Sequence, residues 1–343
     1  MKKKVVILSY YSGTVSRGVE TIVTEIQARL KDKIDLTVYS AASVGLKPRL
    51  PPAGRPTILN YLYLDPTSLS VCRFTKMVLK KLEADPPDIL LPLNNGWMSL
   101  YAKLFCRQRP TKLTLAGFSG IGWDDKVNLW LKPDVFICLT RFHASWAKSV
   151  NPKANLKTIA VGVNTARFTR QGKKFHHGLK PPVILTVAGP QKTKRAGLAI
   201  KAVAQAKNAS LLLVGSQRPE TITLGQKLLG NRFKNIAVGY RDLPPVYRSC
   251  QAYTLPALPV EAYGISILEA LASGLPVVVT DDPIRAELVG RAGYLVDPTN
   301  LNLYASALKK ALSRQPPVSP RTQALKFSWD GLAQKYLKLW QVL

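Results

Sequence analysis

The sequence predicts an α/β protein with two doubly wound parallel sheets, one in each half of the chain. Short runs of β-branched residues and leucine recur, and they are apolar throughout, as strands buried on both faces must be. Each run is followed by a longer stretch of helical character, which is the alternation typical of such domains. At 343 residues the chain exceeds one ordinary core, so we expect two domains.

The expected strands fall into two sets of six, separated by a polar segment. The first set covers residues 5–10, 35–39, 88–93, 112–116, 134–140 and 156–161. The second covers residues 183–188, 210–215, 235–239, 252–255, 276–280 and 293–296. Each set has the number of strands that a doubly wound sheet commonly holds.

The segment 169–182 is polar and contains glycine and proline, so it is predicted to link the two domains. The first domain is then expected over residues 1–168 and the second over 183–325. The last stretch, 326–343, is predicted to form an amphipathic helix with Ser328 as its N-cap. Because one face of this helix is strongly apolar, we expect it to pack back on the first domain.

The composition is that of a folded and strongly basic protein, with 49 Lys and Arg against 20 Asp and Glu and a formal net charge of +29. Such a charge attracts anionic lipid, nucleic acid or phosphorylated small molecules, although a basic bias of the whole proteome would also produce it. No apolar run approaches the ~18 residues of a membrane-spanning helix, and the N-terminus reads as a buried strand rather than a signal peptide. Four scattered cysteines favour a reducing cytoplasm over disulfides or a cysteine metal site.

Two acids flank a glycine-led apolar segment in the second half, EAYGISILEALASG. Gly264 is predicted to begin a helix that ends near Ser273, with Gly274 as its C-terminal stop. The N-terminus of such a helix offers amides and a positive dipole end to a diphosphate. Glu261 precedes the helix and Glu269 lies about one and a half turns into it, so both are suited to accept hydrogen bonds from hydroxyls. The alternative is that Glu261 is a surface acid and Glu269 faces solvent.

The surrounding segment, residues 243–298, closely resembles the signature region of the retaining glycosyltransferases of family 4. That pattern has two glutamates eight positions apart, then G-x-P-V-V, an acidic turn and a later E-L-V. The matching residues are Glu261, Tyr263, Gly264, Glu269, Ala270, Gly274, Pro276, Val277, Val278, Asp281 and Glu287. The resemblance is clear from about residue 156 to the end of the chain and weaker before it.

The resemblance implies the glycosyltransferase B architecture, in which two Rossmann-like domains face a cleft and the second holds a nucleotide sugar. It implies a metal-independent hexosyltransferase that retains the anomeric configuration and needs no cofactor beyond its nucleotide-sugar co-substrate. By position, Glu261 would contact hydroxyls of the donor sugar and Glu269 the ribose. Tyr263 belongs to the same donor site, and the amides around Gly264, Ile265 and Ser266 would face the diphosphate.

The loop after the strand at 183–188 carries several cations where a parallel sheet presents its carboxyl edge. Gly189 and Lys192 are expected near the donor, and Lys194 or Arg195 is expected to neutralise the leaving diphosphate. Pro190 stands where the family has an arginine. The alternative is a basic surface loop.

The first domain departs further from the family. Gly13 and Gly18 lie in a loop after the first strand and are expected to approach donor phosphates or the acceptor. Ala116, Gly117 and Phe118 stand where the family often has a histidine, and His143 is expected to be a packed or surface residue of a helix. Asp124 and Asp125 are either bases near the acceptor or acids that interact with a helix dipole.

A helix is predicted at 69–82. One of its sides carries the cations Arg73, Lys76, Lys80 and Lys81, and another side carries Leu69, Cys72, Leu79 and Leu82. Residues 103–112 add four more cations. Such surfaces suit an anionic membrane, although a solvated helix face explains them equally well.

The sequence therefore predicts a cytoplasmic transferase, peripheral to the inner face of a membrane, that moves a sugar from a UDP- or GDP-sugar to a saccharide or lipid-linked glycan. One alternative is a catalytically silent nucleotide-sugar-binding protein. A nucleic-acid-binding or nucleic-acid-modifying protein is less favoured, because no basic stripe alternates with aromatic residues.

Overall fold

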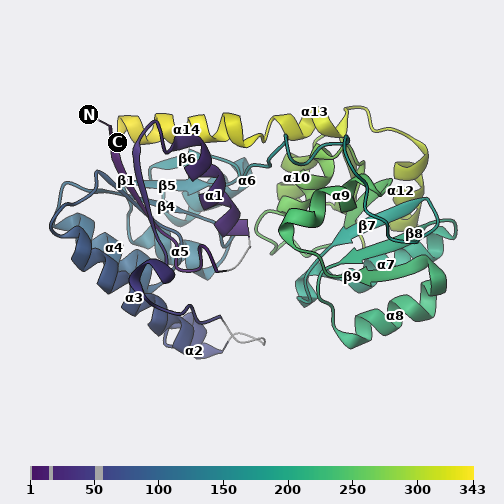
Figure 1. Cartoon of the computed structure of the whole chain (residues 1–343), viewed down its shortest axis with the longest axis horizontal. Helices are drawn as coiled ribbons and strands as arrows, with labels where there is room; N and C mark the ends of the chain where they lie inside the picture. The colour runs from purple at the N-terminus through teal and green to yellow at the C-terminus, as the bar shows by residue number, and fades with distance from the viewer. Residues whose placement is uncertain (1, 15–17, 51–56) are drawn as a thin grey trace. The chain divides into compact units, whose positions relative to one another are not determined.

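The protein is described by a computed structural model that covers residues 2–14, 18–50 and 57–343 (Figure 1). It divides into two compact units. The N-terminal unit comprises Met1–Ala160 together with Asp330–Leu343, and the C-terminal unit comprises Val161–Trp329. Each unit holds one six-stranded parallel sheet with flanking helices, so the predicted fold class is confirmed.

The sheet of the N-terminal unit has the strand order β2-β1-β3-β4-β5-β6. Its strands are β1 (Lys4–Leu8), β2 (Asp35–Tyr39), β3 (Ile89–Pro92), β4 (Lys112–Ala116), β5 (Val135–Cys138) and β6 (Leu156–Thr158). Its helices are α1 (Gly18–Leu30), α2 (Ile58–Tyr61), α3 (Pro66–Leu82), α4 (Trp97–Arg107), α5 (Trp123–Trp130) and α6 (Arg141–Val150). The central strands are buried on both faces, as their continuous apolar character requires.

The sheet of the C-terminal unit has the order β12-β11-β10-β7-β8-β9. Its strands are β7 (Val183–Val187), β8 (Ser210–Val214), β9 (Phe233–Ile236), β10 (Ala252–Leu255), β11 (Val277–Thr280) and β12 (Gly293–Val296). Its helices are α7 (Ala196–Ala206), α8 (Pro219–Leu229), α9 (Leu243–Arg248), α10 (Ile265–Ala272), α11 (Pro283–Val289), α12 (Leu301–Ser313) and α13 (Pro320–Leu325). All twelve predicted strands are present across the two sheets.

In each parallel sheet, the order of the strands changes direction between two neighbouring strands, and the loops that follow these two strands lie next to each other. In the N-terminal unit the reversal lies between β1 and β3, and in the C-terminal unit between β7 and β10. Loops that leave the carboxyl ends of two strands at such a reversal diverge to opposite faces and leave a crevice that commonly binds ligands. The loop after β7 contains Gly189 and Lys194, and the loop after β10 contains Glu261 and Gly264.

The last helix, α14 (Trp329–Val342), begins in one unit and continues in the other. In the C-terminal unit the Trp329 ring covers Gly162, where an added Cβ would lie 2.6 Å from the ring. In the N-terminal unit the guanidinium of Arg29 donates to Asp330 at 2.6 Å, and Trp340 is fully buried. Figure 1 shows α14 running along the N-terminal unit beside α1 and β6.

The contact division falls at residues 160 and 161, ahead of the segment that the sequence suggested as a linker. Arg321 of α13 shows why residues 161–168 belong to the second unit. Its guanidinium donates to the carbonyls of Thr165 at 2.8 Å and Phe168 at 2.8 Å. It also donates to Ala272 at 2.6 Å, at the end of α10. One partly buried cation therefore holds three segments of the C-terminal unit together.

Candidate active site

The N-terminus of α10 faces the carboxyl edge of the C-terminal sheet, after the loop that leaves β10. Gly264 is its N-cap and has a φ of 94°, a backbone conformation that favours glycine. A Cβ at this position would also lie 2.9 Å from the Cδ1 atom of Ile267. The helix ends at Ala272 and Gly274 has a φ of 77°, so the predicted start and stop are confirmed. The first-turn amides, including those of Ile265 and Ser266, have no carbonyl partner within the helix.

Glu269 lies inside the unit rather than on its surface. Its side chain is 4% exposed, and the Tyr247 hydroxyl donates to its Oε2 atom at 2.8 Å. Burial raises the pKa of this carboxyl to about 7, while the Tyr247 hydrogen bond and the charge of Arg167 act in the opposite direction. The solvent-facing alternative for Glu269 is therefore wrong. A buried carboxyl with a single hydroxyl donor has lone pairs left for further hydroxyl donors.

Tyrosines surround the first turn of α10. The Tyr253 hydroxyl donates to the Ser266 hydroxyl oxygen at 2.8 Å, and the Tyr247 hydroxyl approaches the Ser266 carbonyl at 3.2 Å. The two rings are stacked with centroids 6.0 Å apart. Tyr263 is also buried, next to the N-cap. This packing fixes Ser266 and Glu269 on a rigid helix instead of a loop.

Glu261 forms an ion pair with Lys194. The Lys194 Nζ atom lies 2.6 Å from Glu261 Oε1, and each side chain is 20% exposed. Lys194 ends a short 3₁₀ helix, Lys192–Lys194, that follows β7, whereas Glu261 follows β10. The pair thus joins the two loops that diverge at the strand reversal. Glu261 is not a free surface acid, so that alternative is also wrong.

Arg195 is adjacent to Lys194 but is held differently. Its Nε atom donates to the carbonyl of Pro256 at 2.6 Å and its Nη2 atom to that of Ala257 at 3.1 Å. Its own backbone has a φ of 49°, unusual for a residue other than glycine. The guanidinium therefore braces the loop after β10. Arg195 is thus held mainly by backbone carbonyls, whereas Lys194 is held by the side chain of Glu261. Of the two cations expected near a diphosphate, Lys194 can therefore exchange its partner more easily.

The remaining residues of the β7 loop are more peripheral. Lys192 is exposed, and Gly189 packs against Gln191, whose Oε1 atom would lie 2.5 Å from an added Cβ. In the N-terminal unit, Gly13 follows β1 with a φ of 81° and no atom within 4 Å of an added Cβ, and Gly18 begins α1. Residues 15–17 of the same loop lie outside the described residues. Gly13 therefore lies in the segment between β1 and α1 and Gly18 at the start of α1, as the sequence predicted.

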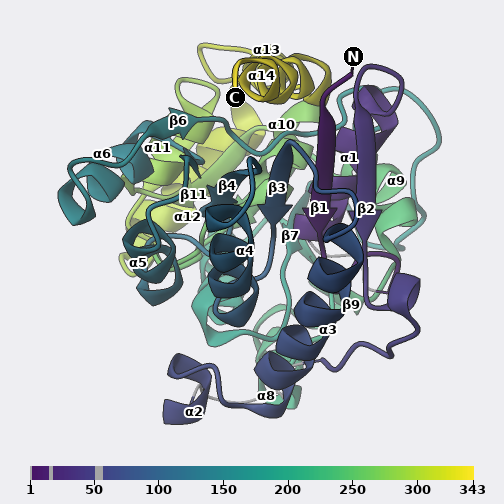
Figure 2. The same ribbon diagram turned by 90° about the vertical axis from the view of Figure 1, so that its left-hand side faces the viewer.

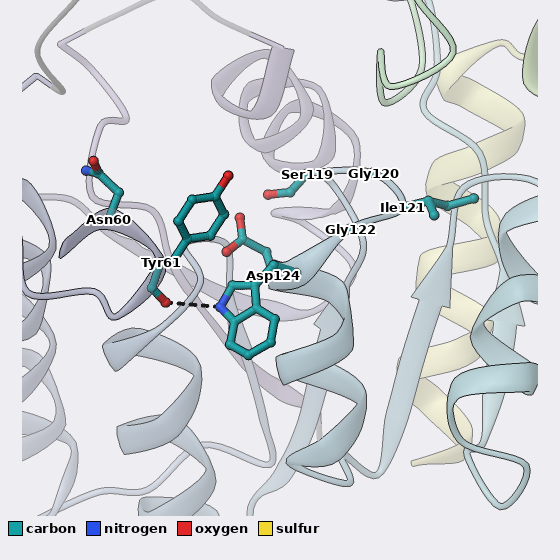
Figure 3. Close-up of a pocket in the computed structure, with 8 residues that line it drawn as sticks. Asn60, Tyr61, Ser119, Gly120, Ile121, Gly122 and Asp124 are labelled. Carbon is teal, nitrogen blue, oxygen red and sulfur yellow. Dashed lines mark hydrogen bonds between the residues drawn. The ribbon is translucent and has the colours of Figure 1, made fainter. Parts of the chain in front are cut away.

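Asp124 lines a cavity of about 320 Å³ in the N-terminal unit. The Tyr63 hydroxyl donates to its Oδ1 atom at 2.6 Å. Figure 3 shows the carboxylate of Asp124 and the hydroxyls of Ser119 and Tyr61 turned toward the same space. The indole of Trp123 closes one side by donating to the Tyr61 carbonyl at 3.0 Å. Aromatic walls with a few hydroxyls and one carboxylate suit a saccharide, whose faces are apolar and whose edges carry hydroxyls.

Asp125 does not line this cavity, so the two neighbouring acids lie in different surroundings. It is completely buried, and its Oδ2 atom lies 3.0 Å from Nε2 of His143 on α6. The imidazole Nδ1 accepts the Leu139 amide at 3.4 Å, so Nε2 carries the proton that faces Asp125. Burial raises the pKa of Asp125, and the His143 hydrogen bond opposes that shift. As a base for a substrate, Asp125 is therefore excluded by its burial.

The same imidazole explains the missing histidine after β4. An added Cβ at Gly117 would lie 2.1 Å from Cε1 of His143 and 2.5 Å from Oδ2 of Asp125. The space that a side chain at 117 would need is thus filled by an imidazole from a different helix. Of the two positions expected for His143, on the surface or packed inside, the structure shows the packed one. The sequence gave no signal for its contact with Gly117, because the two residues lie 26 positions apart in the chain.

Three further findings concern residues 2–14, 18–50 and 57–343. No three His, Cys, Asp or Glu side chains there gather closely enough to hold a metal ion. None of the helices in those ranges has both the length and the apolar character that a bilayer crossing requires. Cys72, Cys106, Cys138 and Cys250 are free thiols.

The family model described as Glycosyl transferases group 1 matches residues 181–314. Mannosylfructose-phosphate synthase of Agrobacterium fabrum (strain C58 / ATCC 33970) is 29% identical over 221 residues, which is 54% of this chain and 48% of that protein. O-antigen chain mannosyltransferase B of Escherichia coli is 29% identical over 107 residues, 30% of this chain and 28% of that protein. These matches span less than half the length of either relative.

Solved structures match over the whole chain. Sucrose-phosphate synthase from Thermosynechococcus elongatus has a TM-score of 0.77 at 16% identity, with 99% of this chain and 98% of that one covered. Anabaena Alr3699/HepE, solved in complex with UDP and glucose, has a TM-score of 0.72 at 16% identity, with 99% and 100% covered. At such identities the likeness shows the fold, which is glycosyltransferase B. Together with the family match over residues 181–314, it supports the resemblance to group 1 glycosyltransferases that the sequence indicated.

Proposed function

We propose that this protein transfers a hexose from a nucleoside diphosphate sugar to a hydroxyl of a saccharide or lipid-linked glycan, with retention and without a metal ion. The observation that carries the proposal is the arrangement at the reversal of the C-terminal sheet. There the N-terminus of α10, the Lys194–Glu261 pair and the buried Glu269 lie on two adjacent loops and one helix. Each suits one part of a nucleotide sugar.

The diphosphate is expected at the N-terminus of α10, where unpaired amides and the helix dipole favour negative charge. Lys194 adds a full positive charge next to this place. While no donor is bound, its ammonium is neutralised by Glu261 at 2.6 Å. When a diphosphate arrives, the ammonium can turn to it and release the carboxylate. Binding of the donor and release of the Glu261 carboxylate from Lys194 are then coupled.

Glu269 and Glu261 are expected to serve hydroxyls of different parts of the donor. Glu269 is fixed in the helix and already accepts one hydroxyl hydrogen bond, so it suits the vicinal hydroxyls of a ribose. Glu261 lies before the helix and suits the hydroxyls of the transferred sugar. During transfer the bond between the anomeric carbon and the diphosphate oxygen breaks, and the electron pair leaves with the diphosphate. The acceptor oxygen bonds to the anomeric carbon and its proton passes to the leaving phosphate, while Lys194 stabilises the charge that develops.

The acceptor is expected in the cavity lined by Asp124. Its walls place Tyr61 and Trp123 against sugar faces, and Asp124 and Ser119 within reach of sugar hydroxyls. The complexes of Anabaena Alr3699/HepE with UDP and with UDP-glucose make UDP-glucose the first donor to test.

The deciding experiment is thermal unfolding with a panel of UDP-, GDP- and ADP-sugars, followed by product analysis with saccharide acceptors. A ligand at ~100 times its dissociation constant stabilises the folded state by about 2.7 kcal/mol. We expect one nucleotide class to stabilise the wild type, Glu269→Ala to lose that effect, and Glu220→Ala on the exposed face of α8 to retain it. Stabilisation without transfer or donor hydrolysis would favour a silent binding protein, and stabilisation by none of the donors would reject both. The anomeric configuration of the product, read by NMR, tests retention.

A further inference from the structure

An apolar surface lies at one end of the N-terminal unit, outside the site described above. It consists of side chains on α2, on the turn after it and at the start of α3, which we name the apolar tip: Ile58, Leu59, Leu62, Leu64 and Leu69. Ile58 is 69% exposed and Leu62 is 53% exposed. Figures 1 and 2 show α2 beyond the N-terminal end of α3, away from the sheet of this unit. Monomeric proteins rarely leave such a group of aliphatic side chains in water without a partner.

Cations continue this surface along α3. Leu69, Arg73, Lys76 and Lys80 follow one another at spacings of four, three and four residues, and all four are exposed, so they form one stripe. The sequence-based expectation that Leu69 lies on another side of the helix than these cations is wrong. The side of α3 that packs inward carries Val71, Phe74 and Val78 instead.

Exposed negative charge is missing from the same stretch. Asp65 is the single acid between residues 57 and 82. It is buried at the N-cap of α3, where it accepts the amides of Thr67 at 2.9 Å and Ser68 at 3.1 Å. The surface of α2 and α3 over these residues is therefore apolar at one end and purely cationic along the stripe.

Tryptophans extend the apolar tip sideways onto α5. Trp123 and Trp130 are about half exposed and pack edge to face with centroids 5.7 Å apart. Lys126 is exposed between them on the same face of the helix. The Trp123 indole donates to the Tyr61 carbonyl at 3.0 Å, which ties this face directly to α2. Tryptophan with neighbouring lysine is typical of the interface between lipid headgroups and hydrocarbon.

We propose that this surface docks on a bilayer that contains anionic lipid. The apolar tip and the two tryptophans enter the headgroup region, and the α3 stripe lies over the phosphates. Ordinary surfaces carry exposed aliphatic side chains, tryptophan pairs or rows of cations separately. Their combination, with no exposed acid among residues 57–82, is that of an interfacial membrane contact. Nucleic acid would use the cations and leave the aliphatic side chains in water, so it fits less well.

The docking would also place the acceptor cavity at the membrane. Asn60 and Tyr61 of α2 and Trp123 of α5 line both the cavity and the edge of the docking surface. This part rests on the proposed function, and it specifies the acceptor class as a glycan whose anchor stays in the bilayer. The membrane contact itself does not depend on transferase activity.

The test is co-sedimentation of the full chain with vesicles of phosphatidylcholine alone and of phosphatidylcholine with phosphatidylglycerol. We expect binding to the anionic vesicles, and we expect Ile58→Ser/Leu62→Ser to weaken it about tenfold. Leu303→Ser/Leu325→Ser, which removes two exposed leucines of the C-terminal unit, should bind as wild type does. Arg73→Ala and Lys80→Ala should each weaken binding to anionic vesicles by about fivefold and leave binding to neutral vesicles unchanged.

Three outcomes would overturn the proposal. Equal binding by the Ile58/Leu62 and Leu303/Leu325 variants would show that the apolar tip does not enter the bilayer. Loss of self-association by the tip variant in sedimentation velocity, with vesicle binding intact, would assign the surface to a second copy of the chain. Binding that depends on the charges alone would reduce the contact to electrostatic adsorption. Thermal unfolding confirms that each variant is folded, and donor-induced stabilisation without vesicles reports separately on the proposed function.

Discussion

The two units have the same architecture but use the carboxyl edges of their sheets differently. In the C-terminal unit, the edge holds the partly exposed Lys194–Glu261 pair and the buried Glu269 with a raised pKa. In the N-terminal unit, another pair of titratable side chains, Asp125 and His143, is sealed in the interior. A pair that keeps some access to water can exchange partners with a ligand, whereas a sealed pair can only hold helices together. Titratable pairs on similar sheets are therefore suited to ligand binding in one unit and to packing in the other.

The strongest test of this difference between the units is to remove the cation of the partly exposed pair, Lys194. We expect Lys194→Ala to lower the transfer rate about 100-fold or more, because a charge that stabilises the leaving diphosphate is lost. Lys201→Ala, at an exposed position of α7, should change the rate little. Steady-state kinetics with the donor found by thermal unfolding measures both. Equal rates for the two variants would contradict the role of Lys194.

The second prediction concerns the pH dependence of stability. Because burial raises the pKa of Glu269 from 4.5 to about 7, its protonated form is favoured in the folded state. The resulting stability is present below the pKa of the unfolded chain and is lost as the pH rises through about 7. The loss amounts to roughly 3 kcal/mol in the free energy of unfolding.

Glu269→Gln should flatten this part of the profile, since an amide keeps an acceptor for Tyr247 but does not titrate. Glu220→Gln on the surface of α8 should leave the profile as in the wild type. Urea unfolding at a series of pH values between 4 and 8 gives the comparison. A profile for Glu269→Gln that parallels the wild type would show that another group is responsible.

The third prediction addresses the sealed pair. Gly117→Ala should destabilise the protein by about 1–3 kcal/mol, because the new methyl group meets the imidazole of His143 in a packed interior. Gly122→Ala is the matched control, since its nearest neighbouring atom would be 3.9 Å away. Chemical unfolding measures both. If the two variants are equally stable, the space at Gly117 is less tightly filled than the distances indicate.

The smallest expected effect lies in the acceptor cavity. Tyr63→Phe removes the hydroxyl that donates to Asp124 at 2.6 Å, at a cost of about 1 kcal/mol in stability. If Asp124 orients the acceptor, the variant should raise the KM for the acceptor and leave the KM for the donor unchanged. Tyr61→Phe, which keeps the aromatic wall, separates the effect of the ring from that of its hydroxyl. A change in donor KM alone would remove Asp124 from the acceptor site.

The sequence predicted those features that depend on neighbouring residues. All twelve strands were found from runs of apolar residues, and the bounds of α10 from Gly264 and Gly274. Local patterns suffice there because burial on both faces and a left-handed cap leave few other residue choices.

Features made by distant segments were not predicted. Lys194 and Arg195 are neighbours in the sequence, and their order does not predict that Lys194 pairs with Glu261. It also does not predict that the carbonyls of Pro256 and Ala257 bind Arg195. The burial of Asp125 beside Asp124 likewise depends on α6, which the local sequence does not reveal. The apolar tip was missed because α2 is a single helical turn, too short to produce a periodic pattern.

The chain leaves the N-terminal unit at Ala160 and returns to it at Asp330, so that one unit is interrupted by the other. The C-terminal unit is continuous and can fold as soon as it has been synthesised. The N-terminal unit must wait for the helix that buries Trp340, which at ribosomal speeds of 5–20 residues per second is a delay of roughly ten to thirty seconds. During that time the surface that α14 will cover is open to solvent, so it is exposed to non-native contacts until the last residues are made.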